Sequence, residues 1–244
     1  MLLAGAFFLP APTRYWVWGG TLACYLTLVG LGVAFIRMRF FCRAQCRGVQ
    51  GGSRVALTFD DGPDPAATPV LLDVLRELNA PAAFFCIGER VRANPDLVRR
   101  IAADRHEIGN HTFCHAWWTS LLCGRRLDAE ISRCQDILRE VLGREATRFR
   151  PPMGLTNPHF GAALRRAGLT MVGWDVRSLD HEARDAQRVI RRVLRRCRDG
   201  SIILLHDGDA DPDVLRAVVS GVVTSLRARE FAFVSLDDLL NEAN

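Results

Sequence analysis

The chain contains no lysine: all 32 basic residues among its 244 are arginine. It therefore lacks both the lysine of a P-loop and the amine that forms Schiff bases, which excludes these two kinds of chemistry. The first 52 residues also lack any acidic side chain, so the net charge of +5 resides there and the rest of the chain is formally neutral. A neutral domain offers no broad basic surface to nucleic acid. We therefore expect neither a nucleic-acid partner nor a nucleotide cofactor.

Cysteine is present but is not arranged as a disulfide framework. Eight cysteines occur, and five of them, an odd number, follow residue 52 without regular spacing. Small secreted domains instead use even numbers of cysteines at framework-like spacings. The pattern predicts free thiols and a reducing compartment.

Charge is also missing from one long run, residues 16–36. Its 21 uncharged residues match the ~20 that a helix needs to cross the hydrocarbon core of a bilayer. Aromatic residues such as Trp16 and Phe40 flank the run, where interfacial anchors are expected. A cleaved signal peptide fits less well, because no basic segment precedes the run and no A-x-A-like site follows it. A buried core helix is the other alternative, and we predict a transmembrane helix at residues 16–36.

The arginines around this run are unevenly distributed. Only Arg14 precedes it, whereas four arginines follow it within residues 37–52. The positive-inside bias places the following domain in the cytoplasm, with the periplasm as the alternative. We accordingly divide the chain into an N-terminal apolar segment at residues 1–15, the transmembrane helix, a basic juxtamembrane linker at residues 37–52 and one domain at residues 53–244.

From residue 53 onward the chain alternates between short apolar runs and amphipathic segments. Runs 54–59 and 82–88 are typical of buried strands, and segment 69–78 between them carries apolar residues at helical spacing. Similar pairs follow, up to a last strand at residues 231–236. Six or seven such units in about 190 residues predict a parallel α/β architecture, whose active site lies at the carboxyl ends of the strands.

Polar clusters occur at five of these predicted strand ends. The first is the adjacent pair Asp60 and Asp61 in TFDDGP, which follows the strand at residues 54–59. Two neighbouring carboxylates repel each other, so their placement together favours a shared cation or proton. The alternative is a solvated turn, since Asp, Gly and Pro are favoured turn residues.

The second cluster is HTFCH, with His111 and His115 four residues apart on one helical turn or in a compact loop. This spacing lets both imidazoles reach one ion, and a carboxylate from a neighbouring strand end completes a site with one open position, as in catalytic zinc centres. Cys114 is a competing ligand that we expect to point away. The alternative is a solvated pair of histidines.

Three further clusters follow the later strands. Arg150 is a candidate partner for a carboxylate that stays free as a base, although it also suits an ordinary surface ion pair. The two prolines after it fix the backbone so that the N–H of Met153 can face a developing oxyanion. His206 offers a proton donor, and Asp180 can hold its far nitrogen and raise its basicity. A lone histidine after an apolar strand is also compatible with a structural role.

In this order, TFDDGP, HTFCH, FRPPMG, WDVRSLDH and IILLHDG resemble the five motifs of the polysaccharide deacetylase family, the NodB-homology carbohydrate esterases. The resemblance extends over residues 53–235 and is closest in the first, second and fifth motifs. It implies an α/β fold, a distorted and incomplete (β/α)7-type barrel, here with one N-terminal transmembrane helix. It also implies metal-dependent hydrolysis of acetyl groups, usually the N-acetyl group of GlcNAc units in envelope glycans. A membrane-anchored bacterial member is expected in the inner membrane.

The resemblance also assigns roles by position. It makes Asp60 the general base, oriented by Arg150. It makes His206 the general acid, tethered by Asp180, and assigns the oxyanion hole to the backbone N–H of Met153. The implied ligands of a divalent metal, zinc in the first place and cobalt or nickel as alternatives, are Asp61, His111 and His115.

Two places depart from the family pattern. Tyr or Phe usually stands where this chain has Met153, and a DTxDW-like sequence where it has residues 177–181, which include Arg177 and His181. These positions concern the walls that face the sugar more than the reaction. We expect an acetylated amino-sugar glycan or a lipid-linked sugar as the partner. The alternatives are an O-acetyl esterase and a catalytically silent, membrane-bound glycan-binding protein.

An arginine-rich helix is predicted at residues 182–197. Most such stripes are a solvated face, but next to a membrane span attraction to anionic membrane lipid is the alternative. Its basic residues are Arg184, Arg188, Arg191, Arg192, Arg195 and Arg196.

Overall fold

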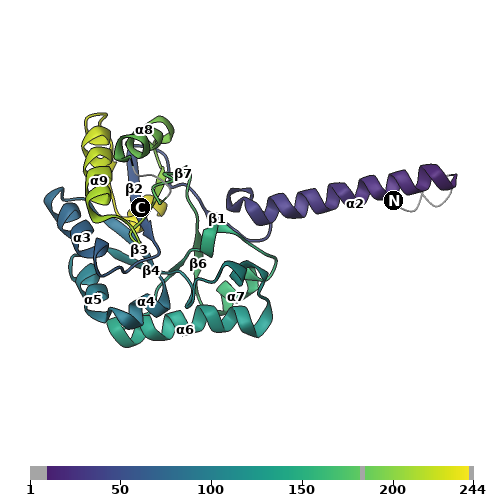
Figure 1. Ribbon diagram of the computed structural model, residues 1–244, viewed down its shortest axis with the longest axis horizontal. Helices are drawn as coiled ribbons and strands as arrows, with labels where there is room; N and C mark the ends of the chain where they lie inside the picture. The colour runs from purple at the N-terminus through teal and green to yellow at the C-terminus, as the bar shows by residue number, and fades with distance from the viewer. Residues whose placement is uncertain (1–9, 182–184, 242–244) are drawn as a thin grey trace.

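The computed structural model describes residues 10–181 and 185–241. An α/β domain occupies most of the chain, and one long helix, α2 (Ala11–Ala34), projects from it (Figure 1). Of the predicted N-terminal apolar segment at residues 1–15, the first nine residues lie outside the described residues.

The strands form one parallel sheet in the order β1-β6-β5-β4-β3-β2-β8-β7, with β9 paired to β2. Within the described chain, edge strands β1 and β7 each pair with one neighbour only, so the curled sheet does not close. This confirms the predicted incomplete (β/α) barrel. The strands are β1 (Ala44–Gln45), β2 (Arg54–Asp60), β3 (Ala82–Cys86), β4 (Glu107–Asn110), β5 (Arg148–Phe149), β6 (Thr170–Val172), β7 (Val176–Arg177), β8 (Ile202–His206) and β9 (Ala232–Phe233).

Helices surround the sheet, with α7, α6, α5, α3, α9 and α8 following one another around its outside (Figure 1). Neighbouring helices in this ring pack against each other, as α3 does with α9 and α9 with α8. The helices are α3 (Ala67–Glu77), α4 (Gly88–Ala93), α5 (Pro95–Ala103), α6 (Gly124–Leu142), α7 (Phe160–Arg166), α8 (Ala186–Arg196), α9 (Pro212–Arg227) and α10 (Leu236–Leu240), with short 3₁₀ turns η2 (Ile36–Met38), η3 (Trp117–Leu121) and η4 (Pro152–Gly154).

Alternation along strand β2 places the first motif. Val55, Leu57 and Phe59 belong to the main core between sheet and helices. Successive side chains of a strand point to opposite faces, so Thr58 and Asp60 lie on the inner face. Asp60 is the last residue of β2 and pairs in register with His206, the last residue of β8. Strand geometry therefore brings the first and fifth motifs side by side.

Helix α10 covers the end of the barrel opposite to the motifs. Its Leu236 and Leu239 pack with inward-facing residues such as Phe85 in a second, smaller core cluster. The last strand was predicted to reach Leu236, but β9 ends at Phe233. The reason is a helix cap: the side chain of Ser235 accepts a hydrogen bond from the N–H of Asp238, which starts α10.

The segment predicted as a linker, residues 37–52, contributes to the fold. Ala44 and Gln45 form edge strand β1 and pair with Met171 and Val172 of β6. Farther along, the N–H of Gly48 donates to the carbonyl of Gly200. The sheet thus begins before residue 53, because a two-residue edge strand has too little pattern to be recognised in sequence.

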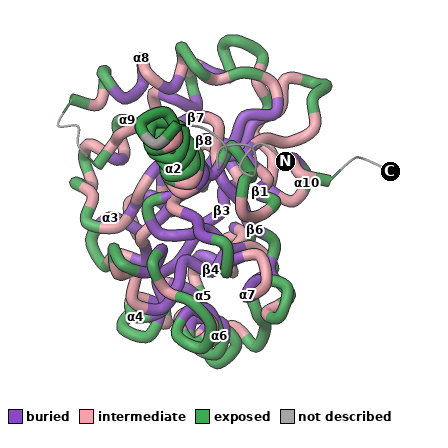
Figure 2. Tube along the Cα trace, turned by 90° about the vertical axis from the view of Figure 1, so that its right-hand side faces the viewer, coloured by how far each residue is buried: buried purple, intermediate pink, exposed green. Residues whose placement is uncertain are grey.

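Helix α2 starts five residues earlier than the predicted span and ends at Ala34, two residues earlier. A stretch of it, Pro12–Ala34, is long and apolar enough to cross a membrane, a test that a signal sequence also passes. Only 6% of its most apolar window is buried, and the helix is exposed on all sides where it is seen end-on (Figure 2). A buried core helix is therefore excluded as an explanation of its apolar sequence.

The arginine-rich segment forms helix α8, which begins at Ala186 after Asp185 caps its first turn. Its apolar residues Val189, Ile190 and Val193 are buried. Of the predicted helix, residues 182–184, and with them Arg184, lie outside the described residues. The exposed arginines of α8 are Arg188, Arg191, Arg195 and Arg196.

Candidate active site

The polar clusters meet at one end of the barrel, around a cavity of about 360 Å³. Parallel strands end on the same side of the sheet, so residues far apart in sequence converge there. Arg150 and Asp180 do not line the cavity but lie behind the residues that do. Of the eight residues singled out in the sequence, those lining it are Asp60, Asp61, His111, His115, Met153 and His206.

Arg150 is fully buried beneath Asp60. Its Nη1 lies 2.7 Å from Oδ1 of Asp60 and 2.9 Å from the hydroxyl of Thr58. Its other nitrogens donate to the carbonyl oxygens of Val172 and Gly173, and its guanidinium stacks 4.0 Å from the ring centroid of Phe85. All three nitrogens of the guanidinium are hydrogen-bonded, so Asp60 is held in one orientation by a buried ion pair.

Burial works against this pair, because it disfavours an isolated charge. Loss of solvent lowers the pKa of Arg150, and the charge and hydrogen bond of Asp60 partly offset that effect. The surface ion pair that we kept as an alternative for Arg150 is thus wrong: the side chain has no exposed area.

Asp61, His111 and His115 form a second group beside Asp60. Oδ1 of Asp61 lies 3.3 Å from Nε2 of His111 and 3.2 Å from Nε2 of His115. Their three candidate ligand atoms all lie within 4.8 Å of one another. The two histidines lie in a loop after β4 and not on a helix, and positive φ angles at Thr112 (66°) and His115 (51°) turn this loop back on itself.

The donor arrangement of this group fits a divalent cation. Nδ1 of His111 lies 2.7 Å from the carbonyl oxygen of Arg150, an acceptor, so this nitrogen carries the proton and Nε2 presents its lone pair to Asp61. Oδ1 of Asp61 is buried yet makes no hydrogen bond to another described residue. A buried carboxylate oxygen facing two imidazole nitrogens without a donor is what a metal site with three protein ligands requires.

Two of the three residues have the charge that this assignment needs. Burial acts to raise the pKa of Asp61, but the two neighbouring imidazoles outweigh it and hold that pKa well below its usual range. Burial and the proximity of His111 lower the pKa of His115 to about 4. At neutral pH the group therefore offers a carboxylate and a neutral imidazole, the forms that bind metals. Burial acts to lower the pKa of His111, but Asp60 and Asp61 outweigh it and raise that pKa, so a cation has to displace a proton from this ring.

Cys114 does not join the group, as expected. Its thiol lies 3.5 Å from Oε1 of Glu89 and away from the ligand atoms. Burial, together with Glu130 and Glu89, raises the pKa of Cys114 to about 11, so it stays protonated. All eight cysteines of the chain are free thiols in the structure.

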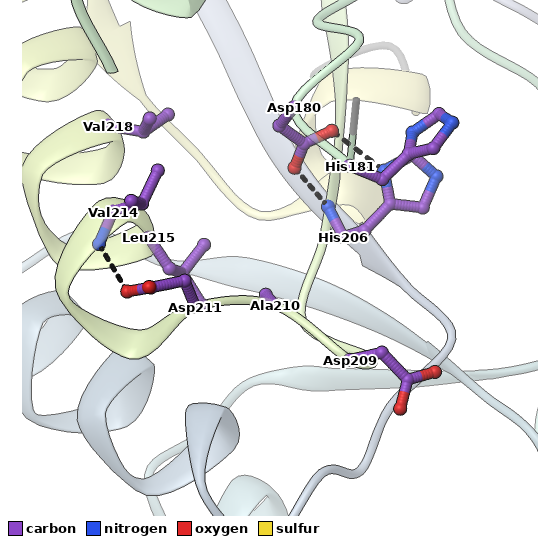
Figure 3. A pocket seen from close by; sticks show the side chains of 10 residues that line it. Asp180, His181, His206, Asp209, Ala210, Asp211, Val214, Leu215 and Val218 are labelled. Atoms are coloured by element: carbon purple, nitrogen blue, oxygen red, sulfur yellow. Dashed lines mark hydrogen bonds and ion pairs between the residues drawn. The ribbon is translucent and has the colours of Figure 1, made fainter. Parts of the chain in front are cut away.

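His206 and Asp180 face each other on the opposite side of the cavity. Asp180 accepts two hydrogen bonds from His206, 2.8 Å from Nδ1 and 2.7 Å from the backbone N–H (Figure 3). It accepts a third from the hydroxyl of Ser178. Burial acts to lower the pKa of His206, but Asp180, followed by Asp60 and Asp61, outweighs it and raises that pKa to about 9. His206 is therefore a cation at neutral pH, with Nε2 left for the cavity.

Asp180, His181 and His206 are also close enough together to hold a metal. The hydrogen bonds argue against it, because both oxygens of Asp180 already accept protons from His206 and Ser178. We therefore interpret this second group as an oriented acid. A larger cavity of about 630 Å³ adjoins it, with an apolar wall from α9 formed by Val214, Leu215 and Val218 (Figure 3).

Met153 forms part of the cavity wall in an unusual backbone conformation. Its φ of 56° is in the left-handed region, which a residue with a side chain seldom adopts. The preceding Pro151 and Pro152 are buried and fix the entry to this turn. The Met153 side chain is 46% exposed, and its N–H makes no hydrogen bond to another described residue. The backbone donor is thus available to a ligand in the cavity.

Comparison with known proteins now bears on this geometry. The family model for polysaccharide deacetylases matches residues 47–172, about half of the chain. This chain belongs to the polysaccharide deacetylase family. The family match begins at residue 47, before the predicted domain start at residue 53; it includes Gly48, which donates to Gly200, but not β1.

Relatives of this polysaccharide deacetylase domain are similar over most of their length. A peptidoglycan-N-acetylglucosamine deacetylase of Bacillus cereus is 35% identical, covering 76% of this chain and 87% of the relative. A chitooligosaccharide deacetylase of Azorhizobium caulinodans is 37% identical, over 78% and 96%. The crystal structure of the Bc1960 peptidoglycan N-acetylglucosamine deacetylase superposes with a TM-score of 0.77 at 29% identity, over 82% of this chain and 94% of that one.

The polysaccharide deacetylase domain contains one buried acid that the sequence analysis missed. Asp207 directly follows His206 and accepts a hydrogen bond from the hydroxyl of Thr68, 2.6 Å away. A Cβ added to Gly62 would come within 2.3 Å of its carboxylate, so Asp207 packs against the turn after Asp61. Burial, with Asp61 and Asp60, raises the pKa of Asp207 to about 7. Its only sequence signal is an acid next to a strand-end histidine.

Trp174 was also missed, although it lines the cavity of this deacetylase-family domain. It lies two residues after the end of β6, and its ring packs so closely on Gly154 that a Cβ added there would clash with it. Arg177 and His181, the departures from the family pattern, line the same cavity. The ring of His181 lies edge-to-face with His206, at 4.9 Å between centroids. The positions that depart from the family pattern thus do form walls of the site.

Proposed function

We propose that this protein is a divalent-metal-dependent N-deacetylase that acts on acetamido sugars of the GlcNAc type, in a cell-envelope glycan or its lipid-linked precursor. One observation carries the proposal. Two adjacent carboxylates have different main partners: Asp60 is paired with the buried guanidinium of Arg150 and is 3.8 Å from Nε2 of His111, whereas Asp61 faces two imidazoles at 3.2 and 3.3 Å. The named activities of the relatives support the choice of substrate class.

In this proposal Asp61, His111 and His115 hold the metal, zinc in the first place and cobalt or nickel as alternatives. When bound, a divalent cation supplies Lewis acidity that polarises a carbonyl group and makes water acidic near neutral pH. The ligand set of one carboxylate and two imidazoles is of the kind found in catalytic zinc centres.

The remaining residues move the protons. Asp60, oriented by Arg150, takes a proton from the water that attacks the acetyl carbonyl carbon. The N–H of Met153 stabilises the negative charge that develops on the carbonyl oxygen. His206, a cation held by Asp180, gives its proton to the amine nitrogen as the C–N bond breaks. The products are acetate and a free amino sugar.

An O-acetyl esterase remains the nearest alternative, because the same residues would protonate a departing alcohol. A catalytically silent glycan-binding protein is the alternative from another class, and the complete set of acid, base and ligand side chains speaks against it. Hydrolysis of an amide needs proton delivery to a poor leaving group, and the raised pKa of His206 supplies it. That feature favours the amide substrate.

We further propose that α2 is a single membrane span and that the domain faces the cytoplasm, with the periplasm as the alternative. Two of the arginines behind this orientation also have structural partners: Arg39 donates to the carbonyl of Ala44, and Arg47 to that of Asp199. A phosphatase reporter fused after Asn244 tests the orientation. Reporter activity would place the domain in the periplasm.

The test of the activity is acetate release by the detergent-solubilised full chain from N-acetylglucosamine oligomers, from an O-acetylated sugar and from a lipid-linked acetamido sugar. We expect release of N-acetyl groups that stops with chelator and returns with zinc. The Asp60→Asn variant should bind zinc with little acetate release, whereas Asp61→Asn should lose zinc as well. Release only from the O-acetylated sugar would favour the esterase, and no release from metal-loaded protein would favour the silent binding protein.

A further inference from the structure

Large exposed apolar side chains outside α2 occur in only three segments of the described chain. One follows the C-terminal end of α2, one is η3, and the third is η4 with Met153. Scattered exposed apolar residues are normal, but their concentration at one place marks an interaction site. We define the apolar collar as the six exposed residues of the first two segments, Phe35, Met38, Phe40, Trp117, Trp118 and Leu121.

A dipeptide joins these segments in space. The N–H and hydroxyl of Thr156 donate to the carbonyls of Val33 and Gly32, in the last turn of α2. The side-chain amide of Asn157 donates to the carbonyls of Ser120 and Leu122, at the end of η3. These bonds bring the end of α2 and η3 to the same loop, which directly follows η4 and its cavity-lining Met153.

The chain segments that form and join the collar carry charge of one sign. Its segments belong to stretches without any acidic residue, residues 1–59 and 108–127, and the loop that joins them lies in a third such stretch, residues 146–174. The described stretches present several arginines to solvent near the collar. These are Arg37, Arg39, Arg43, Arg125 and Arg126.

We propose that the apolar collar docks on the interfacial layer of a lipid bilayer that contains anionic phospholipid. Tryptophan and other aromatic side chains settle at the level of the headgroups, and arginines beside them attract anionic phosphate. Trp117 and Leu121 are 67% and 73% exposed, so they are free to enter that layer. The collar lies at the C-terminal end of α2, the candidate span, and on η3, which the loop of Thr156 and Asn157 links to that end.

Other occupants fit these observations less well. A second copy of the chain would bring two arginine-rich, acid-free surfaces together, and like charges oppose such contact. A neutral glycan stacks on aromatic rings but has no need of the surrounding arginines. Of these occupants, only a bilayer with anionic lipid would contact both the apolar and the cationic residues. The proposed span of α2 places such a bilayer next to the collar. The inference rests on the membrane span proposed for α2 and not on the proposed activity.

Docking of the collar would fix the position of the active site relative to the membrane surface. Met153 adjoins the collar through η3 and η4, which pack against each other, and it also lines the catalytic cavity. With the collar in the headgroup layer, the mouth of the cavity opens at the membrane surface. Acetylated sugars attached to lipid would meet the site there.

Tryptophan fluorescence of the full chain tests the docking. A Trp16→Phe, Trp18→Phe background removes the tryptophans of α2 and leaves Trp117, Trp118 and Trp174. The protein is reconstituted in three-to-one phosphatidylethanolamine and phosphatidylglycerol, with part of the lipid brominated near the headgroup end of its chains. An amphipathic surface enters a bilayer by ~5–10 Å, so we expect bromine at that depth to quench a large part of the emission.

Two further variants locate the quenched residues. Adding Trp117→Phe and Trp118→Phe should abolish the quenching and leave the emission of Trp174. Adding Arg76→Trp to that chain puts a reporter on exposed α3, away from α2 (Figure 1), and its emission should not be quenched. Circular dichroism checks that each variant is folded.

Three results would overturn the proposal. The first is emission from Trp117 and Trp118 that brominated lipid leaves unchanged. The second is a spectral shift of these residues on addition of N-acetylglucosamine oligomers without lipid quenching, which would indicate a glycan platform. The third is a shift that depends on protein density in the bilayer without lipid quenching, which would indicate contact between copies.

Discussion

Arg150 contacts His111 through its main chain: its carbonyl oxygen lies 2.7 Å from Nδ1 of the imidazole, while its guanidinium lies 2.7 Å from Oδ1 of Asp60. One residue thus orients a candidate ligand with its backbone and the candidate base with its side chain. A shift of the loop after β5 would disturb both at once. The candidate metal site and the candidate base are mechanically coupled.

Replacement of Arg150 by Met is expected to destabilise the protein strongly. It leaves the buried carboxylate of Asp60 without a cation, and breaking a buried ion pair from one side costs about 3–5 kcal/mol. Arg166→Met is the matched control, because the pair of Arg166 with Asp128 is exposed and should contribute less than about 1 kcal/mol. Chemical denaturation of the two variants gives the comparison. Equal losses of stability would contradict the buried pairing.

Replacement of Asp180 by Asn is expected to shift the pH profile. His206 must be protonated to act as an acid, so activity falls as pH rises through its pKa of about 9. Without the carboxylate that raises this pKa, the alkaline limb moves to lower pH, and activity at neutral pH falls by roughly 10²–10⁴-fold. Ser178→Ala removes one hydrogen bond but keeps the charge of Asp180, so its shift should be smaller. An unmoved alkaline limb in Asp180→Asn would refute the role of this pair.

Replacement of His115 by Gln is expected to lower the affinity for zinc by at least ~10–100-fold, because it removes one of three proposed ligands. His159→Gln is the control, since His159 is exposed and belongs to no cluster of candidate ligands in the described chain. Dialysis against buffered zinc, followed by metal analysis of the protein, measures the change. Zinc retention by His115→Gln at the level of the control would count against the site.

Asp207 is expected to make the metal-free protein less stable as pH rises. Its carboxyl has a pKa of about 7 in the folded chain and an ordinary value of 3.8, so the folded state binds the extra proton between these values. Stability therefore decreases from about pH 4 to pH 7, by ~1.4 kcal/mol for each unit of the shift. Asp207→Asn keeps the acceptor for Thr68 and should lack this decrease, whereas the exposed Asp209→Asn should retain it. Parallel pH curves for wild type and Asp207→Asn would contradict the expectation.

The general architecture was predictable because it depends on regular patterns. Alternation in β2 and the register with β8 follow from apolar runs, and strand ends of parallel sheets converge, so the grouping of Asp60, His111 and His206 could be anticipated. That one carboxylate pairs with Arg150 could be inferred from the residues, but which of Asp60 and Asp61 does so came only with the family resemblance. The two side chains point to different partners because Asp61, just after the strand, has a φ of 72°. The residue pattern does not predict this backbone angle.

Other features have too weak a signal in the sequence. The bond from His111 to the carbonyl of Arg150 uses a backbone acceptor, which every residue has. Strand β1 is two residues long within an arginine-rich segment and resembles a linker. The role proposed for Trp117 and Trp118 depends on Asn157, whose side chain holds η3 beside the loop that contacts the end of α2. These are long-range contacts, which local propensity does not encode.

The hydrogen bonds from Thr156 to the last turn of α2 leave no flexible tether between helix and domain. A long tether would let an enzyme sample a wide volume above a membrane, at a local concentration that depends on tether length. A stiff joint instead holds the domain in one position relative to the helix. With α2 in a bilayer, as proposed, this joint fixes the height of the cavity above the membrane and limits the search for substrate to a thin layer explored by lateral diffusion.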